Sequence, residues 1–532
     1  MTRKAKILKF NTIVSLAAII FIGTLLLVLS KAASPTVSIE AENAGATVAG
    51  CASKNSGVSS ASAGGAVKFG CNTGEFVHPG ILVSKQQLDF VKGKVAASQS
   101  PWKEAYQAAS SGFLGNATRL PAAVAEVKCT DSKYLNPANT PYYPSVGCES
   151  LRDDANAAYT RALLWYYSGK QEYADSAIRI INAWSSTHKK TWFDQPRIVN
   201  GQLVYGQPGD NSDCPSTNPC YQVYSNGLLF NAWAAQSMTR AAEILRYSNS
   251  GWAQQDIQRA ETYFKTVHLD ALGAGWVSSS NWETSVAEAW VNIGIFTNDR
   301  SIFNKGIAYW RQETPRYMYM QSDGTLPLNP FKKITWVTGA DGIKYPTSQI
   351  TPSATEADIR KTWEYTNPAS FIAGLGKETC RDIGHNYMGF GGIANVAETA
   401  RIQGIDLYSE QKDRIIAAYE LNAGYSNELL DEMDSRGLSY DMNTPNVAVP
   451  NLDNMDQAKS GWYPKNNWRC PDFDSGGGSV LLGQEVAYNH YANRSGITMP
   501  QTKRLVERAN VRPSRAGNHM VWETLTHAGN PY

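Results

Sequence analysis

The chain has 532 residues, with 49 Lys and Arg side chains against 47 Asp and Glu side chains, which gives a formal net charge of +2. This balance argues against a protein that holds nucleic acid or anionic lipid by bulk electrostatic attraction, so an acidic ligand would have to be bound locally. The length exceeds that of an average domain but suits one large helical toroid with insertions.

The N-terminus has the features of an export signal. Basic residues within the first nine positions precede an uncharged apolar run over 13–29 and a short stretch of small residues. The run is long for a signal peptide and near the lower limit for spanning a bilayer. Residues 1–33 are therefore either a signal cleaved after Ala32 or Ala33, or an uncleaved membrane anchor. The basic flank predicts that the rest of the chain is secreted, periplasmic or anchored at the cell surface.

Residues 34–75 are rich in Ala, Gly, Ser and Val and contain few large apolar side chains. Such a segment cannot bury much surface. Its phrases VSIEAENAG and SAGGAVKFG resemble the first strands of carbohydrate-binding β-sandwich modules. Since only a fraction of a module is present, we interpret the segment as a linker, a degenerate remnant, or a short hairpin closed by Cys51 and Cys71.

Eight cysteines in a chain predicted to be exported suit four disulfides in an oxidising compartment. No CxxC or HxxxH spacing supports a metal site, and we expect neither a metal nor a cofactor. Connectivity does not follow from sequence alone. Proximity along the chain suggests the pairs Cys51–Cys71, Cys129–Cys148 and Cys214–Cys220, which leaves Cys380–Cys470.

From residue 76 onwards, apolar residues recur at helical spacing in paired segments. Ser84 is placed to cap a first helix, and Gly169 to end a later one. Consecutive helices with short connectors predict an all-α fold over 76–532: an α/α toroid, or incomplete barrel of helical hairpins, with long loop insertions. The expected hairpins are 153–167 with 171–187, 227–247 with 252–267, and 282–296 with 299–314.

Three long polar insertions interrupt this array, at 188–225, 321–367 and 435–478. Loops of this length usually carry function or close over a site. The third insertion contains Trp462 and Trp468, whose rings can stack on sugar faces or simply anchor the loop.

The stretch ETCRDIGHNYMG, at 378–389, holds the highest concentration of chemically active side chains. An amphipathic run over 393–402 follows it, so the stretch lies where a loop enters a helix. A helix entrance presents free N–H groups and a positive dipole end, which favours an anionic ligand. The structural alternative is a capped helix with buried ion pairs.

Several separated phrases, in the same order, resemble the alginate lyase superfamily of polysaccharide lyases. They include NWETSVAEAWVNIGIFTNDRSIF, ETCRDIGHNYMGFGGIANVAETARIQGIDLY and VAYNHYANRSGITMP, and the resemblance covers nearly all of 76–532. It implies an exported α/α-barrel enzyme that cleaves an anionic polysaccharide of uronic acids by β-elimination, alginate first and glucuronan as a variant. We expect a monomer that binds no nucleic acid and meets a membrane only through an uncleaved N-terminal helix.

Elimination needs one group to neutralise the uronate carboxylate, a base to remove the C5 proton, and an acid to protonate the leaving glycosidic oxygen. The resemblance assigns the first role to Asn281 and His385, with His385 also an alternative base. It assigns the acid to Tyr440, which can serve as the base as well. The other tyrosines that stay open as the acid are Tyr387, Tyr408 and Tyr425.

Arg381 and Arg436 are the two candidates for a guanidinium that grips the carboxylate in a forked geometry. The resemblance places an acidic residue, Glu378, in the same site. We expect Glu378 and Asp382 to orient Arg381 and His385 rather than to do chemistry.

Trp282 and His490 complete the predicted substrate-binding set, although His490 also fits a packing histidine. Asn281 has a structural alternative too, since it could cap the helix that begins at Trp282. Two other classes of protein remain open. One is a non-catalytic envelope protein that binds carbohydrate on the same barrel. The other is a glycoside hydrolase, which needs two carboxylates flanking the bond and for which Glu283 and Glu288 are available.

Overall fold

The computed structural model describes residues 52–56, 65–69, 75–129, 145–192, 197–199, 202–204, 226–273, 280–338, 344–350, 354–363, 371–380, 383–435, 483–508, 511–514 and 516–532. Two compact units, 1–72 and 73–532, divide the chain. The described part of the first unit is an antiparallel hairpin of β1 (Ala52–Ser56) and β2 (Gly65–Phe69). A hairpin therefore occurs in the predicted linker segment. The predicted export signal lies outside the described residues, among which no helix is both long and apolar enough to cross a bilayer.

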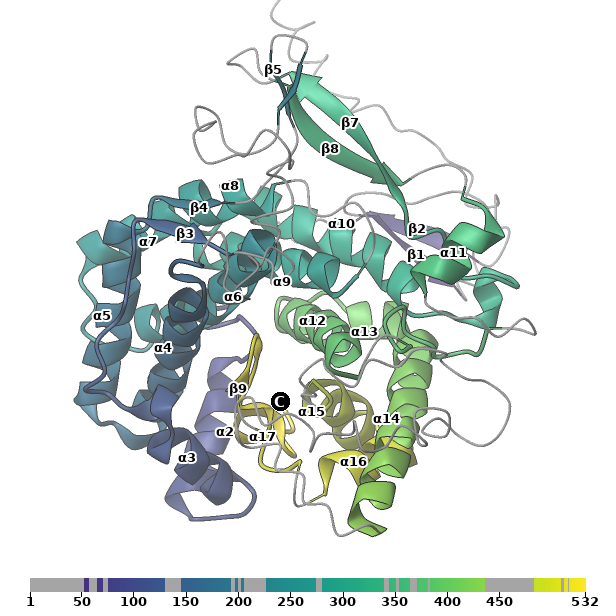
Figure 1. The fold of residues 1–532 in the computed structure, drawn as a ribbon. Coiled ribbons are helices and arrows are strands. Elements are labelled where there is room, and N and C mark those ends of the chain that lie inside the picture. The colour runs from purple at the N-terminus through teal and green to yellow at the C-terminus, as the bar shows by residue number, and fades with distance from the viewer. Residues whose placement is uncertain are drawn as a thin grey trace, which may run out of the picture. The chain divides into compact units, whose positions relative to one another are not determined.

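The second unit is built mainly from helices (Figure 1). Helix α2 (Lys85–Ala96) begins after Ser84, which forms a reciprocal capping box with Gln87. Gly169, at φ +72°, ends α4 as predicted. The other long helices are α3 (Trp102–Ser111), α4 (Cys148–Ser168), α5 (Gln171–Thr187), α6 (Gly227–Arg246), α7 (Gln254–Tyr263), α9 (Asn281–Phe296), α10 (Arg300–Tyr317), α12 (Ile383–Ile402) and α14 (Lys412–Ser435).

Short helices fill the connections. A π-helical turn at Phe264–His268 continues α7, and another at Asn489–Arg494 continues α15. The short α-helices are α8 (Leu269–Leu272), α11 (Glu356–Thr362), α13 (Leu407–Glu410), α15 (Glu485–Tyr488), α16 (Pro500–Val506) and α17 (Glu523–His527).

An inner ring of helices forms the core. Helix α4 packs on α6, α6 on α9, and α9 on α12, and contacts of α12 with α15, α15 with α17, α17 with α2 and α2 with α4 close the ring. Helices α5 and α10 cover α4 and α9 from outside. Both α6 and α9 are buried along nearly their whole length, as expected of helices enclosed on all sides. The predicted α/α toroid is confirmed.

The insertions contribute strands that the sequence analysis did not predict. Strands β5 (Arg197–Val199), β6 (Gln202–Val204), β7 (Lys332–Thr338) and β8 (Lys344–Ile350) form an antiparallel sheet in the order β6-β5-β8-β7. The sequence carried a signal for part of it, since an Asp-Gly pair at 341–342 separates two β-rich runs. Smaller pairs are β3 (Glu126–Lys128) with β4 (Lys190–Trp192), and β9 (Ala516–Gly517) with β10 (Met520–Val521).

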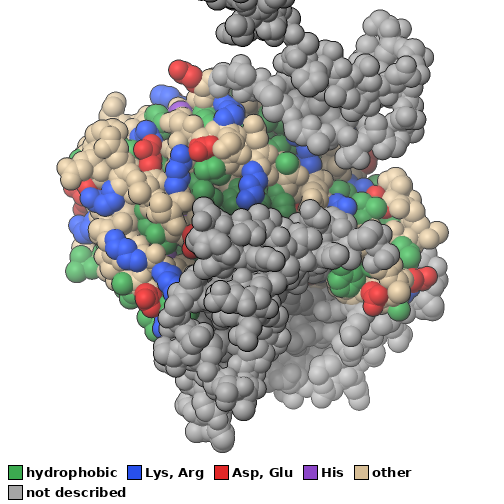
Figure 2. Space-filling model, turned by 90° about the horizontal axis from the view of Figure 1, so that it is seen from above, with side chains coloured by type: hydrophobic (Ala, Val, Ile, Leu, Met, Phe, Trp, Pro, Cys, Tyr) green, Lys and Arg blue, Asp and Glu red, His purple; other side chains and the backbone are tan. Residues whose placement is uncertain are grey.

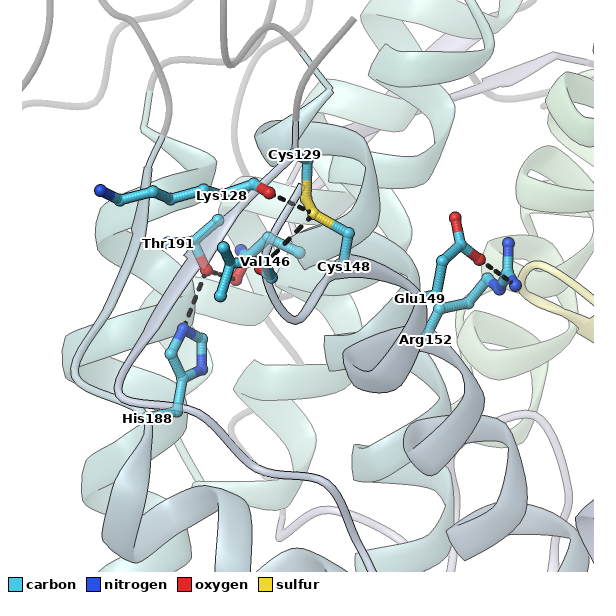
Figure 3. The surroundings of a disulfide bond; sticks show 9 residues. Lys128, Cys129, Val146, Cys148, Glu149, Arg152, His188 and Thr191 are labelled. Carbon is cyan, nitrogen blue, oxygen red and sulfur yellow. Dashed lines mark hydrogen bonds and ion pairs between the residues drawn. A yellow bond between two sulfur atoms is a disulfide. The ribbon is translucent and has the colours of Figure 1, made fainter. Parts of the chain in front are cut away.

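The predicted disulfide between Cys129 and Cys148 is confirmed (Figure 3). Cys148 is the first residue of α4, so the disulfide links the start of this helix to the end of β3. In the same region Lys128 and Val146 form two backbone hydrogen bonds with each other, of 2.9 and 2.8 Å. Cys380 is also disulfide-bonded. Its predicted partner, Cys470, lies outside the described residues. The predicted pairs Cys51–Cys71 and Cys214–Cys220 also lie outside them.

The surface in Figure 2 carries basic side chains interspersed with acidic and apolar ones over its coloured part. An acidic ligand on this described surface would therefore be recognised by a few placed groups rather than by a broad basic field.

Candidate active site

The carboxylate of Glu378 is the centre of the candidate site and is only 4% exposed. Its two oxygens lie 3.0 and 2.9 Å from Nδ2 of Asn281, and Oε2 also accepts the backbone N–H of Asn281 at 2.9 Å. The hydroxyl of Tyr317 donates to the same Oε2 at 2.8 Å. A buried carboxylate is costly unless it is hydrogen-bonded, and these donors offset that cost. Glu378 thereby fixes the position of Asn281.

Asn281 does not cap its helix, so the capping alternative is wrong. Ser280 occupies the cap position of α9, and its hydroxyl accepts the N–H of Trp282 at 3.3 Å. The side chain of Asn281 turns to Glu378 instead. Because a carboxylate only accepts hydrogen bonds, Nδ2 must face it. The Oδ1 atom of Asn281 is buried and receives no hydrogen bond within the described part of the chain.

His385 lies in the first turn of α12 and is half-buried. The Tyr317 hydroxyl that serves Glu378 is 3.2 Å from the backbone carbonyl oxygen of His385. This close approach requires glycine at position 389, because a Cβ there would stand 2.1 Å from the Tyr317 ring. Tyr317 therefore connects the start of α12 with Glu378 and, through it, with the start of α9.

A second set of hydrogen bonds holds the segment that carries Glu378. The Oδ1 atom of Asn422, on α14, accepts from Nδ2 of Asn386 at 3.0 Å and from Oγ1 of Thr379 at 2.9 Å. The Nδ2 atom of Asn422 donates to the carbonyl oxygen of Gly374 at 3.0 Å. Residues on both sides of Glu378 are thus tied to α12 and α14.

The structure joins Asn281 to Glu378 and brings the backbone of His385 close to both through Tyr317, and Trp282 follows Asn281 in the chain. Trp282 is half-buried against an apolar cluster that contains Trp233 and Met388. The other predicted members of the site lie outside the described residues, so their positions stay predictions: Arg381, Asp382, Arg436 and Tyr440.

His490 occupies a different environment. Its ring stacks on Tyr408 with centroids 3.7 Å apart and an interplanar angle of 9°. Burial lowers its pKa to about 4, so the imidazole is neutral at pH 7. The Tyr408 hydroxyl reaches the carbonyl oxygen of Ala394, in the middle of α12. These contacts place His490 in the aromatic packing beside α12 and not in the Glu378 cluster.

The alternative tyrosines are buried. Tyr387 is fully buried, and its hydroxyl is paired with Ser426 at 3.0 Å. Tyr408 is also fully buried, and burial raises the pKa of the Tyr387 and Tyr408 hydroxyls. Tyr425 is 6% exposed and belongs to an apolar cluster with Trp363. The burial of all three gives no support to any of them as the acid.

The two glutamates considered for hydrolysis lie in the helix core. Glu288 forms an ion pair with Arg240 and accepts from Nδ2 of Asn395 at 3.2 Å. Burial raises its pKa despite the nearby guanidinium. Glu283 is fully buried and accepts the hydroxyl of Tyr309. Neither carboxylate is exposed to a sugar, which argues against the hydrolase alternative.

The main support of the site was missed from sequence: Tyr317 and Asn422 reach Glu378 and its segment from two other helices. The available signal was an uncharged polar residue inside an apolar helical stretch, which needs a buried partner. Within the described ranges, no group of three or more His, Cys, Asp or Glu side chains is arranged to hold a metal ion.

Residues 103–330 match the family model described as Alginate lyase. The match covers 228 of the 532 residues, and over this part the chain is similar to alginate lyases. A comparison with curated proteins finds no match.

Similar solved structures include an alginate lyase from Bacteroides ovatus, 12% identical, with a TM-score of 0.49 over 85% of this chain and 100% of that one. Another is alginate lyase A1-III from Sphingomonas species A1, 13% identical, with a TM-score of 0.48 over 86% of this chain and 99% of that one.

Proposed function

We propose that this protein is a polysaccharide lyase, similar to alginate lyases, that cleaves a uronic-acid polymer by β-elimination, with alginate as the first substrate to test and glucuronan as the alternative. The observation that carries the proposal is the contact between Glu378 and Asn281 at the start of α9, with His385 at the start of the neighbouring α12. The alginate lyase family match supports the same reaction class.

Charge stabilisation explains why these groups suit the reaction. As the C5 proton leaves, negative charge develops on the substrate carboxylate, and hydrogen-bond donors held in place beforehand stabilise that charge most in the transition state. In this proposal the Nδ2 group of Asn281, which both oxygens of Glu378 hold in place, also donates to the substrate carboxylate. The positive end of the α9 dipole acts in the same direction.

Proton transfer falls to His385 and Tyr440 in this proposal. His385 provides an imidazole in the first turn of α12, where it serves as a second donor to the carboxylate or as the base. Tyr440 provides the acid for the leaving oxygen, and Arg381 or Arg436 grips the carboxylate. Glu378 is a positioning residue, since its oxygens already accept bonds from Asn281 and Tyr317.

The test is product formation on a panel of polymers. Purified protein is mixed with polymannuronate, polyguluronate, glucuronan and a neutral glucan, and ultraviolet absorbance of the C4–C5 unsaturated product is followed. We expect absorbance to rise with at least one uronate and not with the glucan. Folded protein that yields no absorbance with any uronate contradicts the proposal. Binding without product would favour the non-catalytic alternative, and new reducing ends without absorbance would favour a hydrolase.

We also propose that the enzyme acts outside the cytoplasm. The basic and apolar N-terminal sequence supports export, and the Cys129–Cys148 disulfide suits an oxidising compartment. Cell fractionation with mass spectrometry of the N-terminus tests this. A full-length protein found only in the cytoplasm would contradict it.

A further inference from the structure

A short hairpin near residue 518 packs against the helix that carries His385. Strands β9 and β10 pair with Met520 opposite Gly517 and Val521 opposite Ala516. A Cβ built at Gly391 of α12 would stand 2.8 Å from the sulfur of Met520. The absence of a side chain at Gly391 therefore lets the hairpin lie directly on α12, far from it in sequence.

His519 anchors the turn of this hairpin from inside. It is fully buried, and its Nε2 lies 3.1 Å from the carbonyl oxygen of Met388, so Nε2 carries the proton. Burial lowers the pKa of His519 to about 3, which keeps the ring neutral. Its own carbonyl oxygen accepts from Arg240 at 2.7 Å, and Arg240 is paired with Glu288 in the core. The turn is thus fixed to both α12 and α6.

The neighbouring residue, Asn518, is half-buried and has a left-handed backbone at φ +52°. Its Nδ2 lies 3.1 Å from the sulfur of Met388. A thioether is a weak acceptor, so this contact leaves the carboxamide with hydrogen-bonding capacity for a better partner. Asn is one of the few residues with a side chain that adopts this backbone conformation readily.

Met388 places that carboxamide near the candidate catalytic groups. Met388 follows His385 by three positions on α12, and residues at this spacing lie side by side on one helix face, roughly 5–6 Å apart at Cβ. Met388 also belongs to the apolar cluster whose half-buried edge includes Trp282, the residue after Asn281. The cluster comprises Leu229, Trp233, Met388 and Met520, with Phe230 and Trp282 packed against it.

We infer that Asn518 is a substrate-positioning residue, whose carboxamide binds a hydroxyl group of the sugar next to the bond that is cleaved. An amide both donates and accepts, which matches a hydroxyl group, and the ring of Trp282 offers an aromatic face for the same sugar. The hairpin 516–521 is then part of the substrate site and not only a brace for α12. This inference rests on the proposed function.

Asn518→Gly tests the inference, because glycine keeps the left-handed backbone and removes only the carboxamide. Loss of one hydrogen bond to substrate should raise KM about tenfold with kcat retained, since the contact is made equally before and during the reaction. The matched control is Asn249→Gly. Asn249 also has a left-handed backbone, at φ +59°, but is exposed beyond the opposite end of α6, and its variant should match wild type.

Asn518→Asp provides a second, isosteric variant. Its carboxylate would face a negatively charged uronate, so KM should rise further than with glycine and fall again when salt is added. Thermal unfolding of each variant checks folding.

If wild-type enzyme turns over a uronate and both Asn518 variants keep its KM, the inference fails while the proposed function stands. If wild-type enzyme forms no unsaturated product, the proposed function fails and the inference fails with it.

Discussion

One buried carboxylate precedes α12 and another lies near its C-terminal end, and among the described residues the two have different partners. Before the N-terminal end, Glu378 accepts from the neutral donors Asn281 and Tyr317. Near the C-terminal end, Glu398 lies 2.9 Å from the guanidinium nitrogens of both Arg494 and Arg401. Burial alone would raise the pKa of Glu398, but the two guanidinium groups outweigh it and hold the pKa well below its usual range.

The difference distinguishes a carboxylate that positions the candidate site, Glu378, from one that only stabilises the fold, Glu398. Glu398 is neutralised by the protein's own cations and also accepts from Gln87 at 2.8 Å, so it stabilises the fold. Glu378 instead orients an amide and, through Tyr317, the start of a helix, where a ligand can use them. A buried carboxylate by itself therefore does not mark an active site; the groups that it positions do.

The largest expected effect comes from replacing His385, in the first turn of α12. His385→Ala should lower kcat/KM about 10³-fold, within the range for a lost acid–base group, with little change in thermal stability. Absorbance of the unsaturated product measures it. His78→Ala is the control, because His78 lies at the far side of α6 beside Glu243, and it should keep wild-type kcat. Full activity in His385→Ala would show that His385 is not a catalytic residue.

Glu378→Gln should lower kcat about 100-fold, because misplacing a donor to developing negative charge costs a factor of this order. The amide of Gln would present N–H groups to the N–H groups of Asn281, which then loses its fixed position. Circular dichroism should show a folded protein. Asn281→Ala should lose a similar amount, and the double variant should lose little more than either single one. Additive losses would show that the two side chains act independently.

Removing a partner of Glu398, near the C-terminal end of α12, should lower stability and leave turnover unchanged. Arg494→Ala leaves Glu398 partly uncompensated in the core, which should lower the free energy of unfolding by about 3–5 kcal/mol. Chemical denaturation measures it. The control is Arg504→Ala, since Arg504 and its partner Asp431 are 52% and 44% exposed, and such a pair contributes roughly 1 kcal/mol or less. If both variants lose the same free energy of unfolding, the buried Arg494–Glu398 pair stabilises the fold no more than the exposed Arg504–Asp431 pair.

The smallest effect concerns a third carboxylate, Glu243, which is paired with His78 at 3.0 Å. Burial acts to lower the pKa of His78, but the hydrogen bond and charge of Glu243 overcome it and raise the pKa. The stabilisation is therefore fully present below about pH 6.5, the unfolded value, and is lost as pH rises through the folded pKa. Melting temperature should fall more between pH 6 and pH 8.5 in wild type than in His78→Gln; equal slopes would contradict this.

Much of the fold could be predicted from sequence because its signals are local. Apolar spacing predicted α2, α4, α6, α9 and α12 of the inner ring but not α17, and Ser84 and Gly169 occupy the boundaries expected from their capping chemistry. The pairing of β5 with β8 was missed because the two strands come from insertions more than a hundred residues apart, and no local pattern records such a pairing. The β7–β8 hairpin did have a local signal, the Asp-Gly pair at 341–342, which the sequence analysis did not use.

The residues of the candidate site also divide into those that could be predicted from sequence and those that could not. The resemblance named Asn281, Glu378 and His385. The structure joins Asn281 to Glu378 directly, and the backbone of His385 to Glu378 through Tyr317. The residues that join them were not predictable, since Tyr317 is separated from Glu378 by 61 positions and Asn422 from Thr379 by 43. Whether Tyr440 completes the site stays a prediction, which the assay of Tyr440→Phe alongside His385→Ala can check.

The closure of the helical ring bears on how the chain folds. His527 and Asn530 contact the carbonyl oxygens of Leu82 and Gln87, 445 and 443 positions away. Contacts of such sequence separation form late and slow folding. Until residues 523–530 have been synthesised, the ring cannot close, and the apolar faces of its inner helices stay exposed to aggregation. The protein is therefore expected to depend on chaperones more than its helical composition alone would suggest.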